Sequence, residues 1–185
     1  HVVYGIAGGG LIRHSVRHTK TIPDGTRYQA GVGGEADIES SYYIGGITKI
    51  HDTGGIGYKS NIMDSFIIGE VRYNTIIEGS GALGSNGRDA AKSISNSYGV
   101  LDNSKTTKPI EYAIGGRLPT NINAGGYNVY IESNSVKNPG SFGKTSKQLK
   151  NKDTFVDWDF ENTWDIDTEG VINDGYPYLR GMPTP

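Results

Sequence analysis

The sequence predicts an all-β protein, an irregular right-handed β-solenoid of the parallel β-helix type, with coils of about 24 residues. Glycine supplies 28 of the 185 residues, about twice its ordinary share, and tyrosine supplies 12. Short segments recur with chemically matched positions, and the three clearest follow the glycine-rich elements AGVG, GGIG and GALG. Glycine permits tight corners, and stacking the copies buries apolar side chains that one copy alone leaves exposed.

The composition narrows the functional classes. A net charge of −2 and a pI near 6.1 give no basic surface for nucleic acid. No apolar stretch approaches the roughly 18 residues of a membrane span, so we expect none. Without cysteine, the chain has no disulfide, thiolate catalysis or cysteine-type zinc site. The length fits one domain.

The repeats align residue by residue. Three copies begin at Ile38 (IESSYYIG), Ile62 (IMDSFIIG) and Ile94 (ISNSYGVL). A weaker fourth copy, GYNVYIES, contributes Asn128 and Tyr130, and AGGGLI near the N-terminus resembles an earlier one. The matched columns are Ile38, Ile62 and Ile94; Ser40, Asp64 and Asn96; Ser41, Ser65 and Ser97; Tyr42, Phe66 and Tyr98; and Ile44, Ile68 and Val100.

The columns predict which side chains are buried. Side chains alternate faces along a strand, and Ile38, Tyr42 and Ile44 share a parity, so we expect them to stack inside the coils. The Ser/Asp/Asn column interrupts the alternation and is typical of a bend. The solenoid is predicted over residues 1–144, with the clearest copies at 30–47, 54–71, 81–101 and 125–133.

The C-terminal part, residues 145–185, is predicted to be a helix and an aromatic cap of the same domain. Thr145 and Gln148 fit a capping box, which predicts a short surface helix. Both tryptophans lie in WDFENTWDID, and an edge strand there would turn aromatic residues inward over the last coil and carboxylates outward. The predicted core and cap residues are Ile38, Tyr42, Ile62, Phe66, Ile94, Tyr98, Trp158, Phe160, Trp164, Tyr176 and Tyr178.

These motifs resemble a known family. The Gly-x-[Val/Ile/Leu]-Gly element followed by Ile-x-[Ser/Asp/Asn]-Ser-[Tyr/Phe] is similar to the GLUG-type repeat of bacterial surface and secreted proteins. The closing stretch, with WDF, a second tryptophan and GYPYLRG, resembles the segment that ends such arrays. The resemblance covers about residues 30–181 and implies an extracellular or cell-surface location in a bacterium.

Three groups of residues are candidate functional sites. Asp165, Asp167, Glu169 and Asp174 follow the spacing of a calcium loop, but position 12 is Tyr176 instead of a bidentate carboxylate, and an acidic turn is the competing interpretation. Asp157, Asp159 and Glu161 could form a glycosidase pair only if two carboxylates faced one cleft. Possible external platforms for sugars or partner proteins are Tyr43, Tyr58, Tyr73 and Tyr112.

The sequence favours a non-catalytic extracellular structural or adhesion module of a bacterial surface protein, fibre or appendage, with no catalytic residue and no cofactor other than calcium. Its expected partners are a glycan or a host or cell-surface protein. Self-association through the N-terminal end of the solenoid, which the sequence does not cap, is a further expectation. The alternatives are a polysaccharide-binding or polysaccharide-cleaving β-helix enzyme and an ice- or glycan-binding solenoid.

Overall fold

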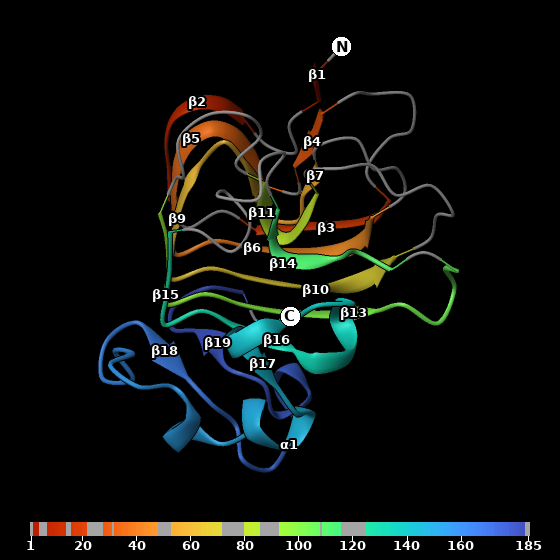
Figure 1. Cartoon of the computed structure of the whole chain (residues 1–185). Coiled ribbons are helices and arrows are strands. Elements are labelled where there is room, and N and C mark those ends of the chain that lie inside the picture. Colours follow the sequence, from red (N-terminus) through yellow and green to blue (C-terminus); the bar gives the residue numbers. More distant parts are fainter. Residues whose placement is uncertain are drawn as a thin grey trace.

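The computed structural model describes residues 2–3, 7–13, 16–21, 28–30, 32–47, 53–71, 80–85, 93–107, 109–115 and 125–183. Before residue 32, and at residue 53, the description is limited to the backbone. The described residues form stacked parallel strands, and the protein is an all-β, solenoid-like fold (Figure 1). The predicted fold class is therefore confirmed.

Two parallel sheets form the coils in the described part of the chain. In the larger sheet, β5 pairs with β8 through its first residues and with β9 through its last, so this sheet bends around the coil. Its strands are β1 (Val2–Val3), β2 (Ala7–Arg13), β4 (Tyr28–Ala30), β5 (Gly33–Glu39), β7 (Thr53–Gly54), β8 (Gly57–Tyr58), β9 (Asn61–Met63), β11 (Gly81–Ser85), β12 (Ile94–Ser95), β14 (Tyr112–Gly115) and β15 (Gly126–Tyr127).

The second parallel sheet forms the remaining side of each coil, and its strands lie one below another in Figure 1. They follow the order β3 (Val16–Thr21), β6 (Tyr42–Ile47), β10 (Phe66–Val71), β13 (Tyr98–Asp102), β16 (Tyr130–Glu132) and β17 (Gly143–Lys144). The short antiparallel pair β18 (Trp164–Asp165) and β19 (Tyr178–Leu179) belongs to the C-terminal part. The helical turns are α1 (Ser146–Leu149), η2 (Ser133–Ser135), η3 (Gly140–Phe142), η4 (Lys152–Thr154) and η5 (Asn173–Gly175).

The strand register agrees with the sequence repeat. Ile62 pairs with both Ile38 and Ile94, and Phe66 pairs with both Tyr42 and Tyr98. The weaker fourth copy is also in register, since Tyr130 lies beside Tyr98. The N-terminal AGGGLI pairs with the first clear copy, because β2 runs parallel to β5 in the same alignment.

The Ser/Asp/Asn column, where the alternation of side chains breaks, forms a sharp corner between the two sheets. Ser40, Asp64, Asn96 and Asn128 all adopt positive φ angles, from 44° to 50°. Asparagine and aspartate tolerate this left-handed conformation better than other residues with a side chain. The serines that follow are buried and link the coils: Ser41 N donates to Ser65 Oγ at 3.2 Å, and Ser65 N donates to Ser97 Oγ at 3.1 Å.

This corner corrects the predicted parity. Ile38 does lie inside the coils, but the alternation restarts after the left-handed residue, so Tyr43 points inside and Tyr42 points outside. Tyr42, Phe66, Tyr98 and Tyr130 therefore form a column on the outer face of the second sheet. The interior core holds Val32, Ala36, Ile38, Tyr43, Ile47, Ile56, Ile62, Ile67, Val71, Ala82, Leu83, Ile94, Leu101, Ile110, Ala113, Ile114, Val129, Ile131 and Val136.

Phe142 closes the last coil. Gly126 occupies the position that Ile94 holds one coil earlier, and a Cβ atom added there would lie 2.6 Å from the Phe142 ring. The ring thus fills the space left by the missing side chain and packs against the interior core. The prediction that Trp158 and Trp164 cap the end of the coils is therefore wrong, because residues 133–144 occupy it.

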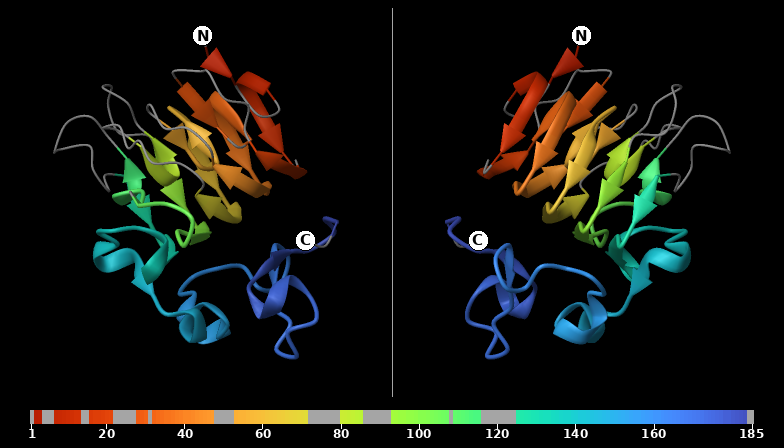
Figure 2. Two further views of the ribbon diagram at one scale, coloured as in Figure 1. Left: turned by 90° about the vertical axis from the view of Figure 1, so that its right-hand side faces the viewer. Right: turned by 90° about the vertical axis from the view of Figure 1, so that its left-hand side faces the viewer.

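The C-terminal segment, defined as residues 145–183, covers the outer aromatic column instead. Figure 2 shows it, in blue, leaving the lower end of the coils and turning back beside them. It begins with α1, where Thr145 and Gln148 form the predicted capping box. The expected edge strand around Trp158 is a series of turns, and in this segment the described strands are β18 and β19. No helix in the described residues is long and apolar enough to cross a membrane.

Candidate functional site: a groove beside the aromatic column

The outer aromatic column is a stack of nearly parallel rings. The centroids of Tyr42 and Phe66 are 4.7 Å apart at 14°, and those of Phe66 and Tyr98 are 5.2 Å apart at 10°. These distances match the spacing of neighbouring strands, so the backbone ladder itself sets the stack. A contiguous aromatic stripe of this kind is stable in water only if another element covers it.

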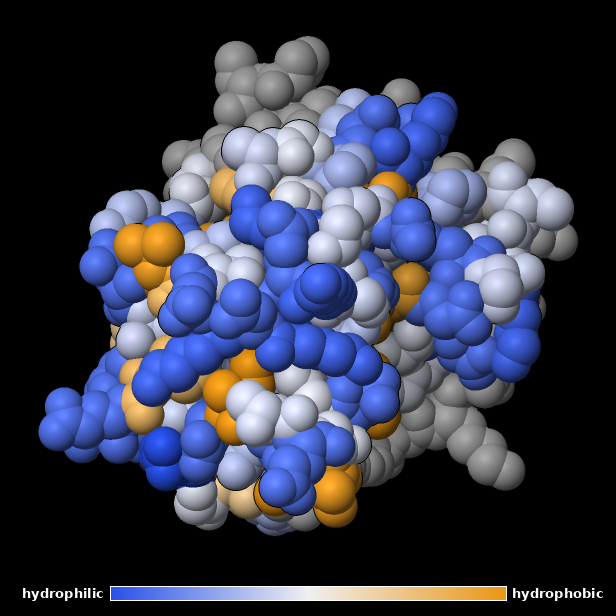
Figure 3. Space-filling view, turned by 90° about the horizontal axis from the view of Figure 1, so that it is seen from below, coloured by the Kyte–Doolittle hydropathy of each residue, from blue (hydrophilic) through white to orange (hydrophobic). Residues whose placement is uncertain are grey.

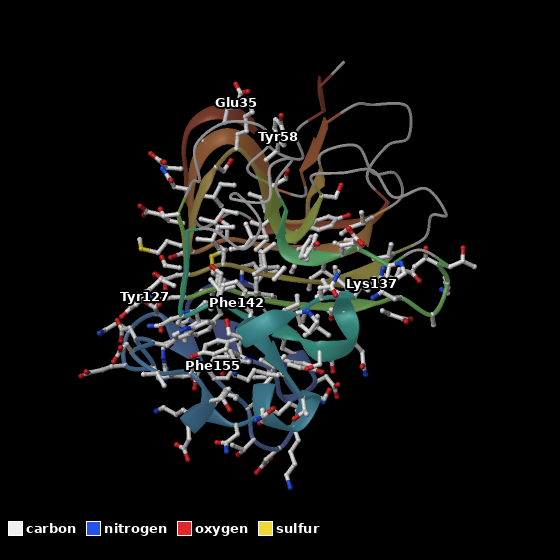
Figure 4. The ribbon with its side chains drawn as sticks, viewed as in Figure 1. Glu35, Tyr58, Tyr127, Lys137, Phe142 and Phe155 are labelled. Carbon is white, nitrogen blue, oxygen red and sulfur yellow. The ribbon has the colours of Figure 1, made fainter. Side chains whose placement is uncertain are left out.

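The C-terminal segment covers the column with its own aromatic residues. Trp164 is fully buried, with its centroid 6.2 Å from that of Phe66 and 6.1 Å from that of Tyr98. The other segment residues buried in this hydrophobic cluster are Leu149, Phe155, Trp158, Phe160, Tyr176 and Leu179, and Phe155 lies below Phe142 in Figure 4. Seen from below, the outside of the molecule is mostly hydrophilic, with small separate apolar patches (Figure 3). The segment thus gives the aromatic face a polar exterior.

Hydrogen bonds hold the segment in a fixed direction along the column. Trp158 Nε1 donates to the Asn128 carbonyl oxygen at 3.1 Å in the fourth copy, and Trp164 Nε1 donates to Asp64 Oδ1 at 3.4 Å in the second. The Tyr98 hydroxyl donates to the Pro177 oxygen, and the Tyr42 hydroxyl donates to the Pro183 oxygen, both at 2.7 Å. The segment therefore runs from the last coil back to the first clear copy.

A groove of about 790 Å³ lies between the second sheet and this segment. Its floor contains the half-buried aliphatic column of Ile44, Ile68 and Val100, which were predicted to lie inside the coils. Ile68 pairs with the other two, so the three side chains form consecutive rungs. Gly69 completes this floor. A Cβ atom at this position would lie 1.9 Å from the Gly45 oxygen, so glycine is the residue that fits here without a backbone shift. The remaining lining residues are Leu101, Asp102, Asn103, Ser104, Glu132, Asn134, Val171, Asn173, Asp174 and Tyr176.

One wall of the groove is a loop ordered by Asp167. Its carboxylate accepts backbone N–H bonds from Glu169 at 2.9 Å and from Val171 and Ile172 at 2.7 Å. These bonds, the one from Ile172 foremost, hold the pKa of Asp167 below its usual range. The loop carries Val171, 83% exposed, at the edge of the groove. A residue first considered as a calcium ligand therefore shapes this wall.

A polar network joins that wall to the sheet. Glu132 Oε1 accepts hydrogen bonds from the Ser146 and Tyr176 hydroxyls, and these two hydroxyl oxygens lie 2.7 Å apart. Lys150 Nζ lies 2.8 Å from Asp174 Oδ2 and 4.6 Å from the Tyr176 ring centroid. Burial is the main cause of the raised pKa of Tyr176, so this hydroxyl stays protonated at neutral pH. The network holds the side chains of Glu132 and Asp174 beside the apolar floor.

The opposite wall offers further hydrogen-bond acceptors. Asp102 accepts bonds from the Ser104 backbone at 2.7 Å and from the Ser104 hydroxyl at 2.9 Å, and these bonds lower its pKa. Asn103 Nδ2 donates to the Asn134 oxygen at 2.8 Å. The Asn103 Oδ1 atom is buried and has no hydrogen-bond donor among the described residues. The exposed Asp102 carboxylate is therefore the acceptor that this wall presents to a ligand.

The predicted external tyrosines do not form a site together. Tyr43 is fully buried, with its hydroxyl donating to the Gly46 oxygen at 3.0 Å, so its predicted external position is wrong. Tyr58 is also buried, because its rung neighbours Gly34 and Ser85 are small and leave room for the ring. Tyr112 is half-buried in β14, away from the groove. Tyr73 lies outside the described residues.

The predicted calcium residues are not brought together either. Asp165 Oδ2 pairs with Arg180 at 3.0 Å, Asp174 pairs with Lys150, and Glu169 is exposed. In the described part of the chain, no group of three or more His, Asp or Glu side chains is arranged to hold a metal ion.

The candidate carboxylate pair lies outside the groove. Asp157, Asp159 and Glu161 are exposed as expected, but they lie on turns instead of an edge strand. Asp159 Oδ1 accepts N–H bonds from Glu161 at 3.0 Å and from Asn162 at 2.8 Å, and its main-chain oxygen accepts from Trp164 at 2.8 Å. Its carboxylate thus organises the turn that precedes Trp164.

The predicted core residues lie in two clusters. Ile38, Ile62 and Ile94 are buried inside the coils, and Tyr178 is half-buried at the edge of the C-terminal segment. The remainder belong to the cluster between sheet and segment, namely Tyr42, Phe66, Tyr98, Trp158, Phe160, Trp164 and Tyr176.

The groove residues Asp102, Asn103 and Glu132 were not predicted from the sequence. The available signal was their position, since Asp102 and Glu132 each end a strand of the aligned second sheet. Comparisons of the chain with protein-family models, with curated proteins and with solved structures find no match.

Proposed function

We propose that the protein is a non-catalytic structural and adhesion module on a bacterial surface, and that it binds its partner in the groove. The observation that carries this proposal is the groove itself, which is open at the surface and lies between the second sheet and the C-terminal segment. Its volume of about 790 Å³ falls within the roughly 300–1,000 Å³ range of ligand sites. Its apolar floor and polar walls provide both contact area and directional bonds.

The fold supports an adhesive role. The coils are joined by parallel ladders through the whole stack, and the buried serines add side-chain bonds between consecutive coils. Such a stack keeps the groove walls in place when a ligand is pulled. The resemblance to GLUG-type repeats is the reason for proposing a bacterial surface location.

The proposal is tested by bead retention. Beads coated with the purified chain are washed over bacterial cells, host cells and extracellular-matrix proteins, and the retained fraction is counted. Ser104→Trp places a bulky ring at an exposed lining position, so we expect it to abolish retention. Ser141→Trp, at an exposed position outside the lining, is the matched control and should retain beads like the wild type. Equal retention by both variants contradicts a role for the groove.

Self-association through the N-terminal coil stays a prediction. In the described residues, β3 is the last strand of the second sheet on that side and pairs only with β6. An edge strand has backbone groups that can pair with another chain. Light scattering over a range of protein concentrations checks this point, and a constant monomer mass contradicts it.

A further inference from the structure

We infer that the groove binds an extended peptide segment of a partner protein, one in which aliphatic residues alternate with lysine or arginine. This inference rests on the proposed binding role of the groove and names the class of its ligand. It follows from three features of the lining: the shape and chemistry of the floor, the absence of an open aromatic face, and the excess of acidic over basic side chains.

The floor suits aliphatic side chains in a row. Ile44, Ile68 and Val100 occupy successive strands, so their side chains repeat at about the 4.8 Å strand spacing. In an extended peptide, side chains on one face repeat at about 6.6 to 6.8 Å, so two of them fit within the roughly 10 Å from the first rung to the third. Each aliphatic contact removes apolar surface from water, and this effect is non-directional and tolerant of the exact side chain.

A sugar ring has no aromatic platform in this groove. Tyr176 is the aromatic residue of the lining, and it is only 6% exposed. Its ring lies against that of Tyr98, with centroids 6.3 Å apart, and the Lys150 ammonium lies over it. Sugar-binding sites commonly stack a pyranose ring on an open aromatic face, and here that face is covered. The lining therefore favours a peptide over a glycan.

The polar groups of the groove are mainly acceptors. Asp102, Glu132 and Asp174 contribute carboxylates, while none of the lining residues is Lys, Arg or His. Two described cations act on these carboxylates from outside the lining: Lys150 pairs with Asp174 at 2.8 Å, and Lys105, which pairs with Glu70 at 2.6 Å, helps to lower the pKa of Asp102. The three carboxylates still outnumber the one cation that pairs directly with a lining residue. A ligand with N–H donors and positive charge complements this arrangement.

The direct test is a fluorescence-anisotropy titration of the full chain with labelled synthetic peptides. The probe is the blocked peptide KVKIKVK, and the comparison peptides are EVEIEVE and TVTITVT, which keep the aliphatic positions and change the charge. We expect KVKIKVK to bind at least about tenfold more tightly than either, which corresponds to about 1.4 kcal/mol. Raising the salt concentration should weaken KVKIKVK selectively, because the rim charges are exposed to solvent.

Charge-removing variants locate the binding. Asp102→Asn combined with Asp174→Asn keeps the shape of both side chains and the left-handed backbone at Asp174, while it removes two negative charges from the groove. We expect this variant to bind KVKIKVK about tenfold more weakly. Asp153→Asn combined with Glu161→Gln removes two exposed charges outside the lining and should bind like the wild type. Circular dichroism confirms that both variants fold.

The outcomes separate the ligand class from the proposed function. Tighter binding of EVEIEVE, equal binding of all three peptides, or no binding of KVKIKVK overturns the inference. Binding of a neutral glucose hexasaccharide that Ser104→Trp abolishes also overturns it and assigns the groove to glycans. If beads adhere through the groove while KVKIKVK does not bind, the adhesive function stands and the ligand class is wrong. If KVKIKVK binds and beads do not adhere, the ligand class stands and the adhesive function fails.

Discussion

The stacked coils and the C-terminal segment both bury aromatic and aliphatic side chains, but they are ordered in different ways. In the coils, the residues of the aligned strands have counterparts one coil away, and parallel ladders and serine bonds repeat with them. The segment has turns in place of long strands, and single carboxylates such as Asp159 and Asp167 accept several backbone N–H groups each.

This difference shows how each part depends on the other. The outer aromatic column would be exposed without the segment, and the segment has too little regular structure to be stable without the column. Both tryptophans lie in the segment, so tryptophan fluorescence reports on the segment and far-ultraviolet circular dichroism reports mainly on the coils. Mutual dependence predicts coincident unfolding curves from the two signals.

Trp164→Ala should have the largest effect. Trp164 is fully buried between the segment and the column, so the change leaves a cavity beside Phe66 and Tyr98. We expect the free energy of unfolding to fall by about 3–5 kcal/mol, as for other buried tryptophans. Urea unfolding followed by circular dichroism and by the remaining Trp158 fluorescence measures it. Loss of the fluorescence transition alone, with the coils unchanged, would show that the segment unfolds separately.

Ser65→Ala should be the next largest change and tests the repeating ladder. The buried Ser65 Oγ accepts from Ser41 N and donates to the Met63 oxygen at 2.8 Å, so removing it leaves a buried N–H group without its acceptor. The expected cost is about 1–3 kcal/mol. Thermal unfolding provides the measurement, with Ser141→Ala at an exposed position as the control. A change no larger than that of the control would mean that the serine bonds contribute little to the coils.

Much of the coil could be predicted because its residues repeat. The aligned isoleucines predicted that Ile62 pairs with Ile38 and with Ile94, and the strand register in the structure agrees with this alignment. The face of Tyr42 could not be predicted by counting alternation through Ser40. A single left-handed residue shifts the parity, and that conformation depends on the tertiary corner.

The groove was harder to predict because its walls come from distant parts of the chain. Asp102 and Glu132 belong to the coils, while Val171 and Asp174 belong to the segment, and nothing in the local sequence states that they meet. Asp167 was recognised as part of an acidic loop, but carboxylate spacing alone cannot distinguish a metal ligand from an acceptor of backbone N–H groups. In the structure, the Asp167 carboxylate accepts three backbone N–H bonds, so its role is to order the loop.

Asp167→Ala should destabilise the protein less than Ser65→Ala, since water can reach the N–H groups that it frees. The pKa of Asp167 is lowered on folding, so its contribution is present above the unfolded value of about 3.9 and is lost as pH falls through the folded value. The wild type and the variant should therefore differ at neutral pH and converge in acid. Urea midpoints at several pH values measure this, and a difference that grows in acid contradicts it. Because the loop carries Val171, the variant should also bind KVKIKVK more weakly.

Asp64→Asn should have the smallest effect. It should raise the stability of the protein, whereas the three variants above lower it. Burial beneath Trp164 raises the pKa of Asp64, so its ionised form is disfavoured in the folded protein. The cost is present above the folded pKa and disappears as pH falls below the unfolded value of about 3.9. Asparagine already occupies this left-handed position at Asn96 and Asn128, and its amide oxygen can still accept the Trp164 bond. We expect a gain in stability of less than about 1 kcal/mol at neutral pH, because the side chain is partly solvated, and no gain in acid. Asp102→Asn is the control. Folding lowers the pKa of the Asp102 carboxyl group, so this variant should lose stability at neutral pH. A loss of stability in both variants would contradict the assigned role of Asp64.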